Sequence, residues 1–181
     1  MTVYIALLRA INVGGRNRVA MTDLRALASD LGLSEPQTLL QSGNLVFRSD
    51  GRRSEDLEAL FEAETAKRLN VQTDFLVRTA AEWSAIVENN PFPSEAKADP
   101  SHLLVMPLKS SSKSEDVEAL QSTIKGSEIV RLGSRHIYLS YPDGIGRSKL
   151  TAARIEKALG TSGTARNWNT ALKLLEMCDG S

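Results

Sequence analysis

A short segment rich in glycine and positive charge, Gly144–Lys149, carries the clearest potential for chemistry. It follows an apolar run typical of a strand, His136–Tyr141, and precedes a run typical of a helix, Leu150–Leu159. A turn from strand into helix directs backbone N–H groups outward, and the helix dipole makes that end partly positive. Arg147 and Lys149 add positive charge there, so a bound phosphate or carboxylate would compensate it.

The start of this helix differs from the starts of other expected helices. Four of those carry an acid in their first turn, at Asp23, Glu55, Glu82 and Glu115. This helix has none before Glu156, and we expect Ser148 to be its N-cap. The glycine spacing matches neither a P-loop nor a dinucleotide-binding fingerprint. We expect an anion-binding site here; the alternative is a salt bridge to the acidic helix at 54–64.

A second glycine- and arginine-rich segment, Arg9–Arg18, begins where the strand expected at Val3–Leu8 ends. Glycine lets a ligand approach the backbone closely, and arginine binds phosphate or carboxylate through paired hydrogen bonds. The candidate binding residues are Arg9, Asn12, Gly14 and Gly15. The alternative is a glycine turn with exposed arginines.

Two further polar segments complete the candidates. One supplies amides and a hydroxyl that could orient a ligand, although the same residue types make ordinary hairpin turns; it consists of Gln41, Ser42, Gly43 and Asn44. The other places a cation, an amide and an indole together, in Arg166, Asn167 and Trp168. The indole could stack on a base or sugar, or it could be buried beneath the final helix.

The residue types favour binding over proton transfer. No Ser/His/Asp arrangement is visible, and neither histidine lies in or beside a polar segment. One cysteine and two histidines argue against a zinc site, so we expect no metal and no cofactor. Catalysis would depend on arginine, lysine and amides, which suit electrostatic stabilisation. Whether the chain is an enzyme stays open at this point.

The composition is that of an ordinary soluble globular protein, with 41% hydrophobic and 24% charged residues in a chain of 181. A net charge of zero argues against bulk, non-specific nucleic-acid binding. No apolar run approaches the roughly 20 residues that span a bilayer, and no signal peptide is visible. The single cysteine, Cys178, excludes an internal disulfide and fits a cytoplasmic protein.

The elements that must position these residues repeat one order twice. In the first half, strands are expected at Val3–Leu8, Thr38–Gln41, Leu45–Arg48 and Thr73–Arg78, with helices after Thr22 and Ser54. The pattern Thr79-Ala80-Ala81-Glu82 predicts a capped third helix. In the second half, strands are expected at His102–Pro107, Glu128–Leu132, His136–Ser140 and Ser162–Arg166, with helices at Ser114 onward, Leu150–Leu159 and Asn167–Met177.

This order predicts an α+β chain with two tandem ferredoxin-like βαββαβ sandwiches, antiparallel sheets and a C-terminal helix. The expected domains are residues 1–89 and 102–181, joined by a proline-rich linker at 90–101. In such a sandwich, the loop after strand one and the hairpin between strands two and three share one edge. The loop after strand three and the end of strand four share the opposite edge. One polar cluster is therefore expected in each half.

Five segments resemble the bacterial family catalogued as domain of unknown function 1697. They are Ala6–Gly15, Gln41–Phe47, Asn90–Pro93, Gly146–Leu150 and Arg166–Thr170. They occur in the family's order over essentially the whole chain, and Ala10 departs from the glycine that the family usually has. The family has no established activity to carry over. The resemblance therefore marks these segments as characteristic without naming a substrate.

Three functions remain in view. The first is binding, with or without catalysis, of a small ligand that bears phosphate or carboxylate. The second is RNA or single-strand binding, because ferredoxin-like sheets often present aromatics to bases; here the second and third strands of the first half offer only Phe47. The third is a structural or protein-partner module. No membrane partner is expected, and the sequence leaves the oligomeric state open.

Overall fold

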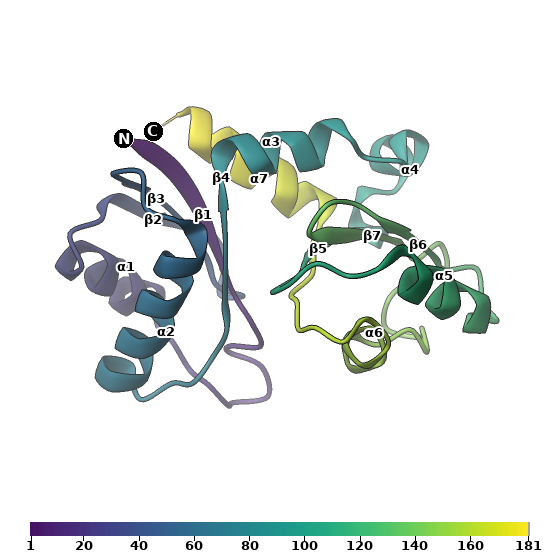
Figure 1. Cartoon of the computed structure of the whole chain (residues 1–181), viewed down its shortest axis with the longest axis horizontal. Helices are drawn as coiled ribbons and strands as arrows, with labels where there is room; N and C mark the ends of the chain where they lie inside the picture. Colours follow the sequence, from purple (N-terminus) through teal and green to yellow (C-terminus); the bar gives the residue numbers. More distant parts are fainter. Residues whose placement is uncertain (181) are drawn as a thin grey trace. The chain divides into compact units, whose positions relative to one another are not determined.

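The computed structural model describes residues 1–180 and contains two four-stranded antiparallel sheets (Figure 1). The strand order is β2-β3-β1-β4 in the first sheet and β6-β7-β5-β8 in the second. Each half thus places its first and third strands at the centre of its sheet. The predicted α+β architecture of two similar halves with a C-terminal helix is confirmed.

The helices and strands alternate as the sequence predicts. The first half consists of β1 (Thr2–Leu8), α1 (Met21–Asp30), β2 (Ser34–Thr38), β3 (Asn44–Ser49), α2 (Ser54–Leu69) and β4 (Phe75–Thr79). Next come α3 (Ala80–Glu88), α4 (Pro93–Ala98) and a 3₁₀ turn, η1 (Pro100–His102). The second half consists of β5 (Leu103–Pro107), α5 (Ser114–Thr123), β6 (Ile129–Leu132), β7 (His136–Ser140), α6 (Ala152–Leu159), β8 (Arg166–Asn167) and α7 (Trp168–Asp179).

The chain forms two compact units. The first unit contains residues 1–85 and the end of α7 from Lys173 onward, and the second contains residues 86–172. The chain therefore passes from one unit to the other within α3 and again within α7. The proline-rich segment 90–101 lies in the second unit and holds α4 and η1.

The helices α1 and α2 cover one face of the first sheet (Figure 1). An aromatic row lies in the core between that sheet and these helices. Tyr4 stacks on Phe47 at 5.5 Å between ring centroids, and Phe61 of α2 stacks on Phe75 at 4.9 Å. Phe47 and Phe61 meet edge to face at 5.5 Å, which joins the two pairs. These four rings are buried between the sheet and the helices, so this unit does not offer them to nucleic-acid bases.

The core of the second unit follows the alternation of its strands. Leu104 and Met106 of β5, with Ile137 and Leu139 of β7, face the helices α5 and α6 and are buried. Tyr138 lies between the last two and points to the other face of the sheet, where its hydroxyl donates to the carbonyl of Ile86 at 2.6 Å. This alternation fixes which side chains of each strand face the helices.

One strand lies earlier than predicted. The sequence favoured Thr38–Gln41, whereas β2 ends at Thr38 and a turn follows it. Pro36 is tolerated because β2 is an edge strand and is irregularly paired between Ser34 and Gln37. The turn itself places Leu40 and Gly43 at φ 61° and 90°, values that a strand does not accommodate.

The last strand of the second unit is also shorter than predicted. The sequence favoured Ser162–Arg166, but β8 comprises Arg166–Asn167, and Gly163 makes only an isolated bridge to Leu108. A Cβ at Gly163 would lie 2.6 Å from the carbonyl oxygen of Pro107, so the chain crosses close to β5 there. The capping box predicted at the start of α3 is confirmed: Thr79 Oγ1 accepts from the Glu82 amide at 3.1 Å, and the Glu82 carboxylate accepts from the Thr79 amide at 2.7 Å.

Candidate functional site

The two polar loops of the first unit meet at one edge of its sheet, as the topology predicted. The amide of Leu8 donates to the carbonyl of Gly43 at 3.0 Å. The Asn12 side chain donates to the carbonyls of Gln41 and Val19, at 2.7 and 3.0 Å, and accepts from the Val19 amide at 2.9 Å. Asn12 therefore joins the loop 9–18 to the turn 41–44, so its side-chain amide has a structural role.

The Gly43–Asn44 step fixes the shape of the turn. A Cβ at Gly43 would lie 2.6 Å from Ile11 Cδ1 and 2.9 Å from Leu8 Cβ, so only glycine fits without movement. Asn44 is fully buried, and its side chain donates to the carbonyl of Leu39 at 2.7 Å and to Ser42 Oγ at 3.2 Å. Packing explains the glycine at residue 43, and hydrogen bonds within the turn explain the asparagine at residue 44.

A shallow hollow lies beside these loops. Its volume is about 480 Å³, and it is lined by Asn12, Gly15, Arg18, Val19, Ala20 and Gln41. Gly14 and Gly15 are exposed and adopt φ of 59° and 75°. Arg9 is half-buried at the end of β1, where its amide donates to the carbonyl of Asp74 at 3.0 Å. This hollow collects less positive charge than the corresponding region of the second unit.

In the second unit, the segment Gly144–Lys149 stands before a helix but does not open it. The helix α6 begins at Ala152, and its N-cap is Thr151, whose Oγ1 accepts from the Arg154 amide at 3.3 Å. The prediction that Ser148 is the N-cap is therefore wrong, because Lys149 and Leu150 separate Ser148 from the observed N-cap. The absence of an acid from the first turn of α6 is confirmed.

Ser148 instead joins two parts of the second unit. Its Oγ donates to Glu128 Oε1 at 2.7 Å and accepts from the Leu150 amide at 3.0 Å. The hydroxyl of Tyr141 donates to the carbonyl of Leu150 at 2.9 Å. Burial, reinforced by the charge of Glu128, raises the pKa of Tyr141 to about 12, so this hydroxyl stays a donor at neutral pH.

These contacts shape a cavity of about 490 Å³, which we term the basic cavity. It is lined by Thr123, Ile124, Lys125, Gly126, Glu128, Arg147, Lys149, Leu150 and Arg154. The last helical residue of α5 and the loop after it form one side, and the loop before α6 with the first turn of that helix forms the other. Four cations and one carboxylate thus surround a single hollow.

Arg154 is held in place by α5 and by its own loop. Its Nη2 donates to Thr123 Oγ1 at 2.8 Å and to the Thr123 carbonyl at 3.1 Å, and its Nη1 donates to the carbonyl of Lys149 at 3.4 Å. A fixed guanidinium loses less conformational freedom when it contacts a ligand. Arg154 therefore provides a preformed positive wall.

The other three cations of the basic cavity form no ion pair with a described residue. Lys125, Arg147 and Lys149 are exposed, and across residues 1–180 no ion pair reaches any of the three. Glu128 lines the same cavity, yet it does not approach a cation within ion-pair distance either. The cavity thus combines unneutralised positive charge with one carboxylate that is hydrogen-bonded to a serine.

The sequence did not point to Lys125, Glu128 or Arg154. The pair Lys125-Gly126 is the same kind of signal as the chosen segments, a base beside a glycine in a turn after a helix. The fold brings this turn next to Arg147 and Lys149, since α5 and α6 pack on the same face of the second sheet (Figure 1).

The chain matches the family described as a protein of unknown function, DUF1697, over residues 1–138. It belongs to this family. It is similar along 98% of its length, and along 98% of the other chain, to the solved structure of a conserved bacterial protein, SP0830 from Streptococcus pneumoniae, with 25% identity and a TM-score of 0.75. No curated protein matches. Within this DUF1697 chain, the segments 146–150 and 166–170 lie beyond the matched residues.

Arg166, Asn167 and Trp168 of this DUF1697 chain are built into the junction of β8 with α7. Arg166 is buried, its Nη1 donates to Thr164 Oγ1 at 2.8 Å and to the Ala165 carbonyl at 3.0 Å, and burial lowers its pKa to about 10. Asn167 Oδ1 accepts from the Thr170 amide at 3.0 Å at the start of α7. Trp168 is buried at 4% exposure. None of the three lines the basic cavity.

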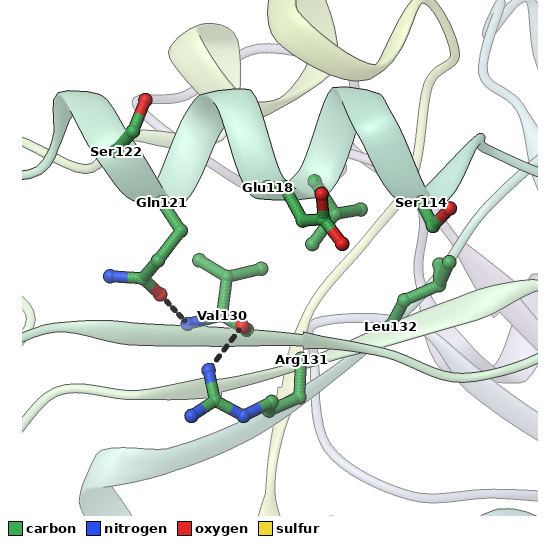
Figure 2. Close-up of a pocket in the computed structure, with 8 residues that line it drawn as sticks. Ser114, Glu118, Gln121, Ser122, Val130, Arg131 and Leu132 are labelled. Carbon is green, nitrogen blue, oxygen red and sulfur yellow. Dashed lines mark hydrogen bonds between the residues drawn. The ribbon is translucent and has the colours of Figure 1, made fainter.

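A further groove of about 480 Å³ runs between α5 and the edge strand β6 (Figure 2). Its lining is mostly apolar, with Val117, Val130 and Leu132 at its base. As Figure 2 shows, Gln121 accepts from the Val130 amide at 2.7 Å, and Arg131 donates to the Val130 carbonyl at 3.1 Å. These two side chains occupy the backbone N–H and C=O of Val130. The lining carries one acid, Glu118, and one base, Arg131, so the groove gathers no net positive charge for an anion.

Within residues 1–180, no three side chains of His, Cys, Asp or Glu are grouped as metal ligands would be. The same part of the chain contains no helix that combines the length and the apolar character needed to cross a bilayer.

Proposed function

We propose that this protein binds a small ligand bearing a phosphate or carboxylate in the basic cavity of its second unit. The observation that carries the proposal is the set of three cations, Lys125, Arg147 and Lys149, which line one cavity and have no ion-pair partner among residues 1–180. Like charges gathered around one hollow repel each other, and an anion between them removes that repulsion.

The chemistry of the cavity suits an oxyanion. Arginine presents a planar fork of N–H donors to phosphate or carboxylate oxygens, and lysine adds a compact point charge. Arg154 is already fixed by Thr123, so part of the site is preorganised. A volume near 490 Å³ falls in the range of small-molecule sites, about 300–1,000 Å³.

Binding of RNA or single-stranded nucleic acid is the less favoured alternative. In the first unit, the aromatic row around Phe47 and Phe61 is buried between the sheet and the helices. Trp168 is buried, and the hydroxyl of Tyr138 is engaged by the carbonyl of Ile86. Bases would therefore find few aromatic faces to stack on, whereas an isolated phosphate requires none.

The test is calorimetric titration of the full chain with glycerol 3-phosphate, inorganic phosphate and a short oligouridylate at fixed ionic strength. The Arg147→Ala/Lys149→Ala variant is expected to lose at least about a hundredfold in affinity for the small phosphates, since each of its two lost hydrogen bonds to a charged group contributes about 1.5–3 kcal/mol. The Arg16→Ala/Arg18→Ala variant makes the same change of charge on the first unit and should bind as the wild type does.

Two results would overturn the proposal. One is the absence of binding of either small phosphate to the wild-type chain. The other is an equal loss of affinity in both double variants, which would show a general charge effect in place of a site. Tight binding of the oligouridylate alone would favour the nucleic-acid alternative.

A further inference from the structure

We infer that the ligand of the basic cavity carries a hydroxyl beside its anionic group, as a phosphorylated polyol does. This inference rests on the proposed function and adds a second recognition element to it. The element is Glu128, the one acidic residue among those that line the cavity.

Only one of the two oxygens of the Glu128 carboxylate accepts a hydrogen bond from a described residue. Its Oε1 accepts a hydrogen bond from Ser148 Oγ at 2.7 Å. In the described chain, residues 1–180, no hydrogen bond reaches its Oε2, and no ion pair within 4.0 Å joins the carboxylate to any of the four cations that line the cavity. One carboxylate oxygen is therefore available to a ligand while the cations remain available to an anion.

The position of this carboxylate is enforced by its neighbours. A Cβ at Gly126 would lie 2.3 Å from Glu128 Oε2, so the absence of a side chain at residue 126 makes room for the carboxylate. Ser148 is oriented in turn by the Leu150 amide, and the Leu150 carbonyl is held by the buried hydroxyl of Tyr141. The acceptor is thus oriented by the hydrogen bond from Ser148, beside a backbone that leaves room for it.

A carboxylate in a cavity for anions selects among them. It repels a ligand that offers only negative charge, and it attracts a ligand that also offers a hydrogen-bond donor. An ammonium group would supply a donor too, but four cations around the cavity disfavour a positive ligand group. A neutral hydroxyl can donate a hydrogen bond to the Glu128 carboxylate without being repelled by the cations. A hydroxylated phosphate ester therefore matches both the four cations and the carboxylate of the cavity.

The test compares methyl phosphate, which has no hydroxyl, with glycerol 3-phosphate in calorimetric titrations of the full chain. The wild type is expected to prefer glycerol 3-phosphate by at least about tenfold, the share expected of one charge-assisted hydrogen bond. Glu128→Ala should abolish this preference, and Glu128→Gln, which keeps the shape, should reduce it. Both variants should bind methyl phosphate at least as tightly as the wild type does. Glu118→Gln is the matched control, because this exposed carboxylate of α5 lines the groove beside β6 and not the basic cavity.

Each outcome is decisive. Equal affinity of the wild type for the two esters overturns the inference and leaves the proposed function standing, as does a preference that survives in Glu128→Ala. Binding of neither ester overturns the proposed function and this inference with it.

Discussion

Replacing Gly43 with alanine tests whether the turn Gln41–Asn44 is set by packing. Gly43 adopts φ of 90°, and a Cβ there would lie 2.6 Å from Ile11 Cδ1. The left-handed backbone costs a non-glycine residue about 1–2 kcal/mol, and forcing an extra carbon into a packed site costs about 1–3 kcal/mol. Gly43→Ala should therefore lower the free energy of unfolding by about 2–5 kcal/mol.

Gly14→Ala provides the matched control. Gly14 also has a left-handed φ, 59°, but a Cβ there would have nothing within 4 Å. It should cost only the backbone part, about 1–2 kcal/mol. Both variants shed a similar amount of unfolded-state entropy, so the difference between them isolates the packing contribution. Urea denaturation followed by circular dichroism measures both. Equal destabilisation of the two variants would refute the packing account of Gly43.

Three further predictions concern packing, pH and the sheet edge. Glu58 is buried, accepts from the Val77 amide at 2.9 Å and lies 3.8 Å from Arg78, so Glu58→Ala should lower the free energy of unfolding by about 3–5 kcal/mol. In the same urea assay, Glu35→Ala breaks an exposed ion pair with Arg48 and should cost at most about 1 kcal/mol. Similar losses in the two variants would contradict this account of Glu58. Burial raises the pKa of Tyr138 and Tyr141 to about 12. Because these phenols ionise at lower pH in the unfolded chain, the free energy of unfolding should fall as pH rises from about 10 to 12. A titration of tyrosinate absorbance in which both phenols of the folded chain are ionised at pH 10 would disprove this prediction. Gln121→Ala should uncover the Val130 amide of β6 and the Glu128 carbonyl just before it, and so promote concentration-dependent association, seen by light scattering. Ser122→Ala on the same helix should cause no association, and a Gln121→Ala chain with the wild-type mass at every concentration would rule this out.

The repeated order of strands and helices could be predicted because hydrophobic alternation and helix caps are local signals. The capping box at Thr79–Glu82 and the acids at the starts of other helices are examples. The errors lie where tertiary context prevails over local pattern. β2 tolerates Pro36 only because it forms the edge of a sheet, and β8 is reduced to Arg166–Asn167 by the close crossing of Gly163 over β5.

The candidate site was predictable in part. Arg147 and Lys149 were selected from their sequence, but their partners Lys125, Glu128 and Arg154 come from other segments that only the fold brings together. Conversely, an amide side chain or a glycine can serve ligand binding or local structure, and the residue type alone does not decide between these roles. Hydrogen bonds and packing within the first unit explain the residue types at Asn12, Gly43 and Asn44. These contacts depend on how two loops meet in the fold.

The most direct measurement of the central claim is amide chemical-shift mapping by NMR during a titration with glycerol 3-phosphate. Binding in the basic cavity predicts saturable shifts concentrated at Lys125, Gly126 and residues 147–150, with the hollow at Gly15 and Arg18 unaffected. Saturable shifts confined to the first unit, or no saturable shifts at any phosphate concentration reached, would contradict it.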